Sequence, residues 1–249
     1  MTLSNTCLMS EPFSQSYYFG PERQSRRYES RKVDPSRSYE AVAKVILQQS
    51  TSDNVDLVFI KDMAYYVKGR LKMLQDFFPG AKHSFLIRDP EKSIPSLYRM
   101  SENAEIRSSG WDYFEPNEAG FKELHEMYEF ITENLAPNPV IVNADDLLES
   151  PKQIMKAYCD GVGIVYEDHM TSWKADEVLL AWQDGWAQAW RQGAMKSSGF
   201  LKPCMSKNAE AFSEPEVTYP NDVIKAIEES RPFYDKLCTA KIRSVSPCD

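Results

Sequence analysis

The chain has 249 residues, of which 42% are hydrophobic and 12% aromatic, enough apolar material for one large globular domain. Its net charge of −8 excludes the broad basic surface that nucleic-acid binding requires, although a local basic pocket for a small anion stays compatible with it. Five scattered cysteines without Cys-x-x-Cys spacing, and three histidines that do not pair, predict neither a disulfide framework nor a metal site.

The sequence shows no signal for a membrane or for secretion. No apolar run approaches the roughly 20 residues that a membrane-spanning helix needs, and the first residues lack a basic stretch followed by an apolar one. We therefore expect a cytoplasmic protein without a membrane span. The length favours a single domain over residues 1–249 and leaves the oligomeric state open.

The predicted elements alternate between helices and strands. The first 35 residues are polar and rich in aromatic side chains, and we expect them to be irregular. Apolar side chains at one-face spacing predict a helix over residues 36–49, and the apolar run from Asp56 to Ile60 predicts a buried parallel strand. Further along, we expect a helix from Tyr65 to Phe78, a strand from Ser84 to Ile87, a helix opening between Lys92 and Arg99, a helix from Pro116 to Leu135, a strand from Val140 to Val142, a helix from Asp145 to Val162 that breaks at Pro151, and helices over about 176–192 and 221–237.

This order predicts an α/β fold with a three-layer arrangement, in which a mostly parallel sheet is flanked by helices. In such sheets ligands bind beyond the carboxyl ends of the strands. The polar residues that end the predicted strands are therefore the candidate site residues. They are Lys61 and Asp62, Arg88 and Asp89, and Asn143, Asp145 and Asp146.

Arg88 and Ser96 form the first candidate constellation. The arginine ends a predicted strand, and the serine lies eight positions further along, near the first turns of the next helix. A guanidinium and a hydroxyl at a helix start can both bind one phosphate, with help from the helix dipole. The spacing alone favours an ordinary helix start with a surface arginine over anion binding.

The segment from Ile87 to Arg99 (IRDPEKSIPSLYR) resembles the 3′-phosphate-binding motif of sulfotransferases that use 3′-phosphoadenosine-5′-phosphosulfate (PAPS). The stretch from Val140 to Gly163 and the strand end Lys61-Asp62-Met63 are also similar to that family, in the family's order. The resemblance covers about residues 10–240 and implies a P-loop NTPase-like sulfotransferase fold. It also implies that Arg88 and Ser96 hold the 3′-phosphate of PAPS.

Three candidate catalytic residues follow from this resemblance and from the strand ends. Glu11 matches the acidic residue that acts as general base on the acceptor in several branches of the family, although a solvated carboxylate before a proline is an equal alternative. Asp62 is the rival base. Lys61 would neutralise charge on the transferring sulfuryl group or on the leaving phosphate, whereas an ion pair with an acidic neighbour is the commoner role of such a lysine.

A late segment completes the candidate nucleotide site. The resemblance implies that a loop near the C-terminal end covers the nucleotide and contacts its 3′-phosphate, but the family's usual Lys-Gly pair is not found there. The residues carried over to this role are Arg191, Lys196, Ser197, Ser198 and Gly199. Just before them, Trp182, Trp186 and Trp190 share one predicted helix face, which favours packing over a role in an acceptor pocket.

One part of the family's pattern has no counterpart in this sequence. Sulfotransferases hold the 5′-phosphosulfate with a first strand and a phosphate-cradling loop, yet only ten residues precede Glu11 and no GxxxxGK[ST] motif exists. The segment TLSNTCLMSEPFS resembles the end of the helix that follows that loop. We therefore expect a fold that is truncated at its N-terminus and lacks a central strand.

Three functions are compatible with these observations. The first is a sulfotransferase that moves a sulfuryl group from PAPS to a hydroxyl or amine of a small molecule or glycan. The second is a non-catalytic nucleotide-binding or interaction protein derived from such an enzyme. The third, a nucleotide-dependent phosphotransferase, would need a Walker lysine that the sequence lacks. Residues 14–35 and 101–120 are the expected acceptor-binding loops, because such pockets are built from loops.

Overall fold

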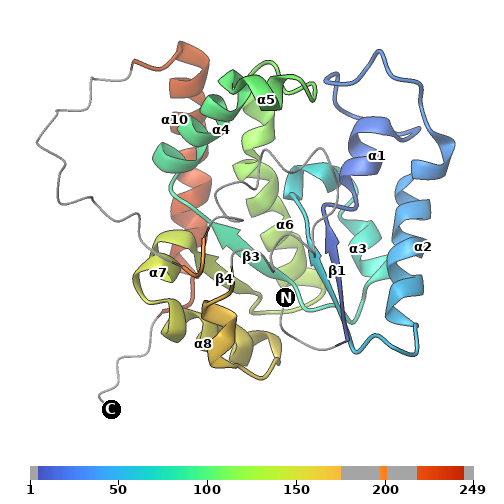
Figure 1. Cartoon of the computed structure of the whole chain (residues 1–249), viewed down its shortest axis with the longest axis vertical. Coiled ribbons are helices and arrows are strands. Elements are labelled where there is room, and N and C mark those ends of the chain that lie inside the picture. The colour runs from blue at the N-terminus through green and yellow to red at the C-terminus, as the bar shows by residue number, and fades with distance from the viewer. Residues whose placement is uncertain (1–4, 175–196, 201–217, 244–249) are drawn as a thin grey trace, which may run out of the picture.

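The four strands in the described part of the chain pair two by two, and both pairs are parallel. The structure is a computed structural model, and it describes residues 5–174, 197–200 and 218–243. Strand β1 (Thr6–Ser10) pairs with β2 (Leu57–Lys61) in a register that aligns Ser10 with Lys61. Strand β3 (Ser84–Ile87) pairs with β4 (Val140–Asn143), with Ile87 opposite Asn143. Helices lie on both sides of the strands, which confirms the predicted α/β fold with parallel strands (Figure 1).

The strands form two separate sheets in the described part of the chain, where one continuous sheet was expected. One sheet has the order β1-β2 and the other β3-β4, and no described strand joins β2 to β3. Because each strand of a two-stranded sheet has a single partner, one backbone edge of β2 and one of β3 lack strand partners in the described residues. The expectation that a central strand is absent remains a prediction.

The expectation that the first 35 residues are irregular is wrong. Residues 6–10 form β1, and Ser14–Phe19 forms helix α1. The suggestion that this segment is the end of a helix is also wrong, because β2 offers Thr6–Ser10 a parallel strand partner that a local pattern cannot reveal. Tyr17 and Tyr18 on α1 are buried, so the aromatic side chains of this region belong to the core.

Two predicted helices are each divided by a glycine. The predicted helix from Tyr65 to Phe78 is a 3₁₀ turn η2 (Ala64–Val67) followed by α3 (Lys72–Phe77), since Gly69 between them has a φ of 70°. The predicted helix from Pro116 to Leu135 is η3 (Pro116–Ala119) and α6 (Phe121–Asn134), divided at Gly120 with a φ of 68°. A Cβ at Gly120 would lie 2.9 Å from Cδ1 of Tyr65, so only glycine fits this position without displacing the tyrosine.

The other predicted helices are present, except the one predicted over about 176–192, which lies outside the described residues. Ser38 caps the first long helix, α2 (Tyr39–Ser50), by accepting from the amide of Ala41. The last one is α10 (Asn221–Thr239). The remaining elements are η1 (Pro35–Arg37), α4 (Pro90–Glu102), α5 (Ala104–Arg107), α7 (Ala144–Glu149), α8 (Pro151–Val162), which begins at the expected break, and η4 (Asp168–Thr171).

Burial differs between the strands, and in β3 only Phe85 and Ile87 are buried, whereas Ser84 and Leu86 are exposed. All four residues of β4 are buried, whereas no residue of β2 is, and Ile60 is 37% exposed. The predicted burial of the strand that begins near Asp56 is therefore wrong. The core beside β1 and β2 is built largely from aromatic side chains, including Phe13, Tyr17, Tyr18, Tyr28, Tyr39, Tyr65, Tyr66 and Trp111. None of the described helices combines the length and the apolar character that crossing a membrane would require.

Candidate functional site

The parallel pairing of β1 with β2 brings Glu11 and Lys61 together. Glu11 directly follows β1, and its amide donates to the carbonyl of Lys61 over 2.6 Å. The Lys61 ammonium forms an ion pair with Oε1 of the Glu11 carboxylate and also lies 3.4 Å from the Met63 sulfur. These two residues therefore share the carboxyl end of one sheet, where ligands of parallel sheets bind.

Glu11 has an unusual backbone conformation. Its φ of 54° lies in the left-handed region, which costs free energy for a residue with a side chain. Strained backbone of this kind is concentrated at functional sites, where the surrounding structure holds it in place. Ser14 helps to hold Glu11 in this conformation, because its amide and its hydroxyl both donate to the Glu11 carbonyl, over 3.1 and 2.6 Å.

Asp62 lies next to Lys61, but its carboxylate faces the backbone. Oδ2 accepts from the amide of Phe13 over 3.0 Å, and Oδ1 accepts from the amide of Met63 over 2.9 Å. Burial raises the pKa of Asp62 to about 7, although both amide hydrogen bonds act in the opposite direction. Since both oxygens are engaged, Asp62 holds the end of β2 against the start of α1.

Tyr66 is a member of this cluster that the sequence did not indicate. Its hydroxyl donates to Oε2 of Glu11 over 3.1 Å, so the two carboxylate oxygens of Glu11 have different partners. The sequence suggested only a helical stretch beginning at Tyr65, and nothing in a local pattern distinguishes a tyrosine that donates a hydrogen bond from one that packs. The contact spans 55 positions in the chain and depends on the tertiary fold.

Arg88 and Ser96 lie where β3 ends and α4 begins. The Asp89 side chain caps α4 by accepting from the amide of Glu91 over 2.8 Å, and Pro90 is the first helical residue. Arg88 is exposed and Ser96 half-buried, in the second turn of the helix. Within the described residues, neither side chain makes a hydrogen bond or an ion pair, so both are available to an anion at this helix start.

Arg231, which the sequence did not single out, ties α10 to this helix start. Its guanidinium donates to both oxygens of Asp89, over 2.8 and 3.3 Å, and also pairs with Glu91 over 3.0 Å. Burial acts to raise the pKa of Asp89, but the hydrogen bonds from Arg231 and from the Glu91 amide outweigh it and lower the pKa below its usual value. This bidentate contact holds Asp89, the residue that follows Arg88, in place.

The predicted late loop is described only in part. Arg191 and Lys196 lie outside the described residues, as do Trp182, Trp186 and Trp190. Ser197, Ser198 and Gly199 are described: Gly199 forms a bridge with Ser172, and the Ser198 carbonyl accepts from the amide of Trp173 over 3.1 Å. Ser198 and Gly199 line an open cavity of about 530 Å³ next to η4, together with Pro151, Lys152, Asp168, His169, Thr171, Ser172 and Phe200.

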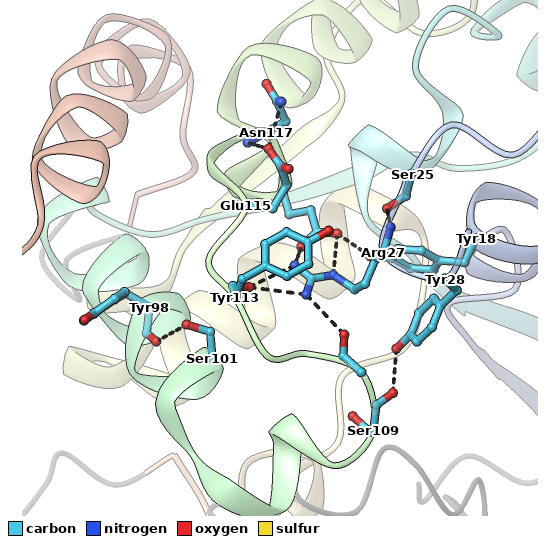
Figure 2. Close-up of polar contacts among 12 residues, drawn as sticks. Tyr18, Ser25, Arg27, Tyr28, Tyr98, Ser101, Ser109, Tyr113, Glu115 and Asn117 are labelled. Carbon is cyan, nitrogen blue, oxygen red and sulfur yellow. Dashed lines mark hydrogen bonds and ion pairs between the residues drawn. The ribbon is translucent and has the colours of Figure 1, made fainter. Parts of the chain in front are cut away.

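The two predicted acceptor loops are joined by a buried ion pair. Arg27 pairs with Glu118 over 2.5 Å, and both side chains are at most 1% exposed. The guanidinium also donates to the carbonyl of Tyr113 over 3.2 Å (Figure 2). It lies over the Trp111 ring, 4.1 Å from the ring centroid. This clamp, consisting of Arg27 and Glu118, holds the segment after α1 against the segment before α6.

Comparison with known proteins shows the family to which the chain belongs. The sequence model of the sulfotransferase domain family matches residues 5–237, and the chain belongs to that family. The family resemblance proposed from the Arg88 motif and the two other stretches is thereby confirmed.

The curated relatives and the solved structure that match the chain have low sequence identity to it. Two branched-chain-amino-acid aminotransferase-like proteins of Arabidopsis thaliana, numbered 1 and 2, are each 27% identical, over 63% and 70% of this chain. The chain spans about a quarter of the length of these relatives, 24% and 27%. A sulfotransferase domain from the curacin biosynthetic pathway is 17% identical with a TM-score of 0.38, covering 76% of this chain and 67% of its own, which is too distant to support an argument.

Proposed function

We propose that this protein transfers a sulfuryl group from PAPS to a hydroxyl or amine of a small molecule or glycan. The observation that carries the proposal is the pair Arg88 and Ser96, whose side chains have no hydrogen-bond or ion-pair partner among the described residues, at the start of the 13-residue helix α4. A free guanidinium, a hydroxyl and the positive end of a helix dipole together fit a phosphate group. Membership of the sulfotransferase domain family supports assigning that phosphate to PAPS.

Each residue at the end of β1 and β2 has a role in this proposal. When bound, PAPS supplies the sulfuryl group. Glu11 takes the proton from the acceptor hydroxyl, and Lys61 offsets negative charge at the reacting centre. Asp62 does not contact the acceptor; it holds the loop that carries Glu11 through the amides of Phe13 and Met63.

The geometry favours Glu11 over Asp62 as the general base. The Glu11 side chain is 25% exposed and its partners are side chains, which can move when an acceptor arrives. Both Asp62 oxygens instead accept from backbone amides, and taking a proton there would weaken two contacts that support the loop.

A non-catalytic nucleotide-binding protein is the second candidate. The observation in its favour is the ion pair between Glu11 and Lys61. Because each charge already has a partner of opposite sign, this pair is stable without a substrate. Nucleotide binding without turnover on any acceptor would support this candidate over the first.

Turnover by Glu11→Gln tests the proposed base. We expect kcat to fall by about 10²- to 10⁴-fold, the usual contribution of a general base, while affinity for 3′-phosphoadenosine 5′-phosphate stays unchanged. Transfer of radiolabelled sulfuryl groups from PAPS to a panel of hydroxylated and amino acceptors measures this. The exposed Glu133 on α6 offers the matched control Glu133→Gln, which should behave like wild type. Equal turnover by wild type and Glu11→Gln would remove Glu11 from the mechanism.

A further inference from the structure

The two oxygens of the Glu11 carboxylate are held from two sides. Lys61 approaches Oε1 from a partly exposed position, with 45% of its side chain exposed. Tyr66 donates to Oε2 from within the core, where it is only 2% exposed. A base that is oriented by a third group is a common arrangement at catalytic sites. Tyr66 has the position of such a group.

Tyr66 is itself rigidly placed. Its backbone carbonyl accepts from the hydroxyl of Tyr39 over 2.5 Å. Its ring packs against three further tyrosine rings, with centroid distances of 4.6 Å to Tyr65, 5.2 Å to Tyr17 and 5.6 Å to Tyr18. Because close-packed aromatic rings leave few alternative rotamers, the Tyr66 hydroxyl is presented to Glu11 in one direction.

A chain of side-chain contacts connects Tyr66, through Tyr18, to the acceptor loops. Tyr18 is fully buried, and its hydroxyl donates to Oε1 of Glu118 over 3.0 Å. Glu118 is the partner of Arg27 in the clamp, and Figure 2 shows Tyr18 beside Arg27. Packed side chains with hydrogen bonds at both ends therefore join Glu11 to the loop before α6.

We propose that Tyr66 is a positioning residue that orients the Glu11 carboxylate, and that Tyr18 makes this orientation depend on the Arg27–Glu118 clamp. The inference rests on the proposed function, since it assigns a supporting group to the proposed base. It makes one of the two predicted acceptor loops part of the machinery that places the base. Substitutions that remove single hydroxyls test this coupling.

Tyr66→Phe and Tyr18→Phe each remove one hydroxyl and keep the ring. We expect Tyr66→Phe to lower kcat at least about tenfold, the effect of losing one hydrogen bond to a charged group, with KM for the acceptor and for PAPS within twofold of wild type. Tyr18→Phe should lower kcat in the same direction and to a smaller extent. The matched control is Tyr158→Phe, which should leave kcat unchanged. The Tyr158 hydroxyl lies 3.4 Å from the hydroxyl of Ser84, the first residue of β3.

A second readout does not require turnover. The Glu11 amide donates to Lys61, so its hydrogen exchange reports how firmly the residue is held. We expect exchange in the peptide around Glu11 to accelerate about tenfold in Tyr66→Phe and to stay unchanged in Tyr158→Phe. If Tyr66→Phe does not fold, ¹³Cζ-labelled tyrosine provides the same test, because the Tyr66 signal should shift between wild type and Glu11→Gln.

The outcomes separate this inference from the proposed function. No turnover by wild type on any acceptor, together with faster exchange in Tyr66→Phe, would contradict the proposed function and support the positioning of Glu11 by Tyr66. Unchanged kcat and unchanged exchange in Tyr66→Phe, or an unchanged ¹³Cζ signal, would overturn the inference. Tyr18→Phe with wild-type kcat would overturn its second half, the dependence on the clamp.

Discussion

Glu11 and Asp62 follow neighbouring strands, yet their surroundings give them different chemistry. The Glu11 carboxylate has a lysine and a tyrosine as partners and is partly exposed. The Asp62 carboxylate is held by two backbone amides, and burial raises its pKa to about 7. In the proposed function, this difference in environment makes Glu11 the general base and Asp62 a residue that supports the fold.

The raised pKa of Asp62 predicts how stability changes with pH. The folded protein binds the Asp62 proton more tightly than the unfolded chain, where the pKa is near 3.8. Between about pH 4 and pH 7 this group therefore makes the free energy of unfolding fall as the pH rises. In Asp62→Asn, the free energy of unfolding should fall less steeply with pH across that window than in wild type. Urea unfolding at several pH values measures this. Asp53→Asn, an exposed control, should follow wild type, and a slope in Asp62→Asn equal to that of wild type would contradict the assignment.

At the scale of elements, the sequence predicted β2, β3 and β4 and missed β1 and the pairing of the strands. The apolar runs near Leu57 and Ser84 identified β2 and β3, and the polar residues after them proved to lie at the strand ends. The strand β1 was missed because its pairing with β2 is not local. Isolated glycines at 69 and 120 would have predicted the two divided helices, since glycine weakens a helix interior.

The clamp between the two loops makes a prediction about stability at this scale. Glu118→Leu leaves the Arg27 charge buried without a partner, and we expect it to lower the free energy of unfolding by about 3–5 kcal/mol. In the double variant Arg27→Met with Glu118→Leu, the free energy of unfolding should fall by a smaller amount, because neither substituted side chain carries a charge. Urea unfolding measures both. The exposed pair of Lys44 and Glu40 offers a control, where Glu40→Leu should cost about 1 kcal/mol or less.

If the double variant of the clamp were as unstable as Glu118→Leu alone, the ion pair would not be the cause of the effect. The loss would then come from packing around Trp111 and Tyr113, whose rings contact the Arg27 guanidinium at 4.1 and 4.3 Å.

At the scale of the whole molecule, the two sheets have strand edges without a partner strand among the described residues. In the described residues, β2 and β3 each pair with one strand only, and apolar side chains on them are exposed, with Leu86 at 63%. The sequence predicted a single sheet because alternating strands and helices normally produce one. Unpaired strand edges of this kind favour association with further strands.

Leu86→Lys should therefore reduce self-association. A charged side chain on an edge strand disfavours pairing with another chain, so the variant should sediment as a smaller species than wild type at high protein concentration. Val45 on α2 is 48% exposed but lies on a helix, and Val45→Lys should sediment like wild type. Equal sedimentation of Leu86→Lys and wild type would show that the strand edge is not the contact.

The central claim is that Arg88 and Ser96 hold the 3′-phosphate of a PAPS-type nucleotide. Titration calorimetry with 3′-phosphoadenosine 5′-phosphate tests it most directly, with Arg107→Ala as a control that changes an exposed arginine on α5. The account predicts that wild type and Arg107→Ala bind equally well, and that Arg88→Ala binds about 10- to 100-fold more weakly, the effect of losing a charge-assisted hydrogen bond. Equal binding by Arg88→Ala and wild type, or no binding by wild type, would contradict it.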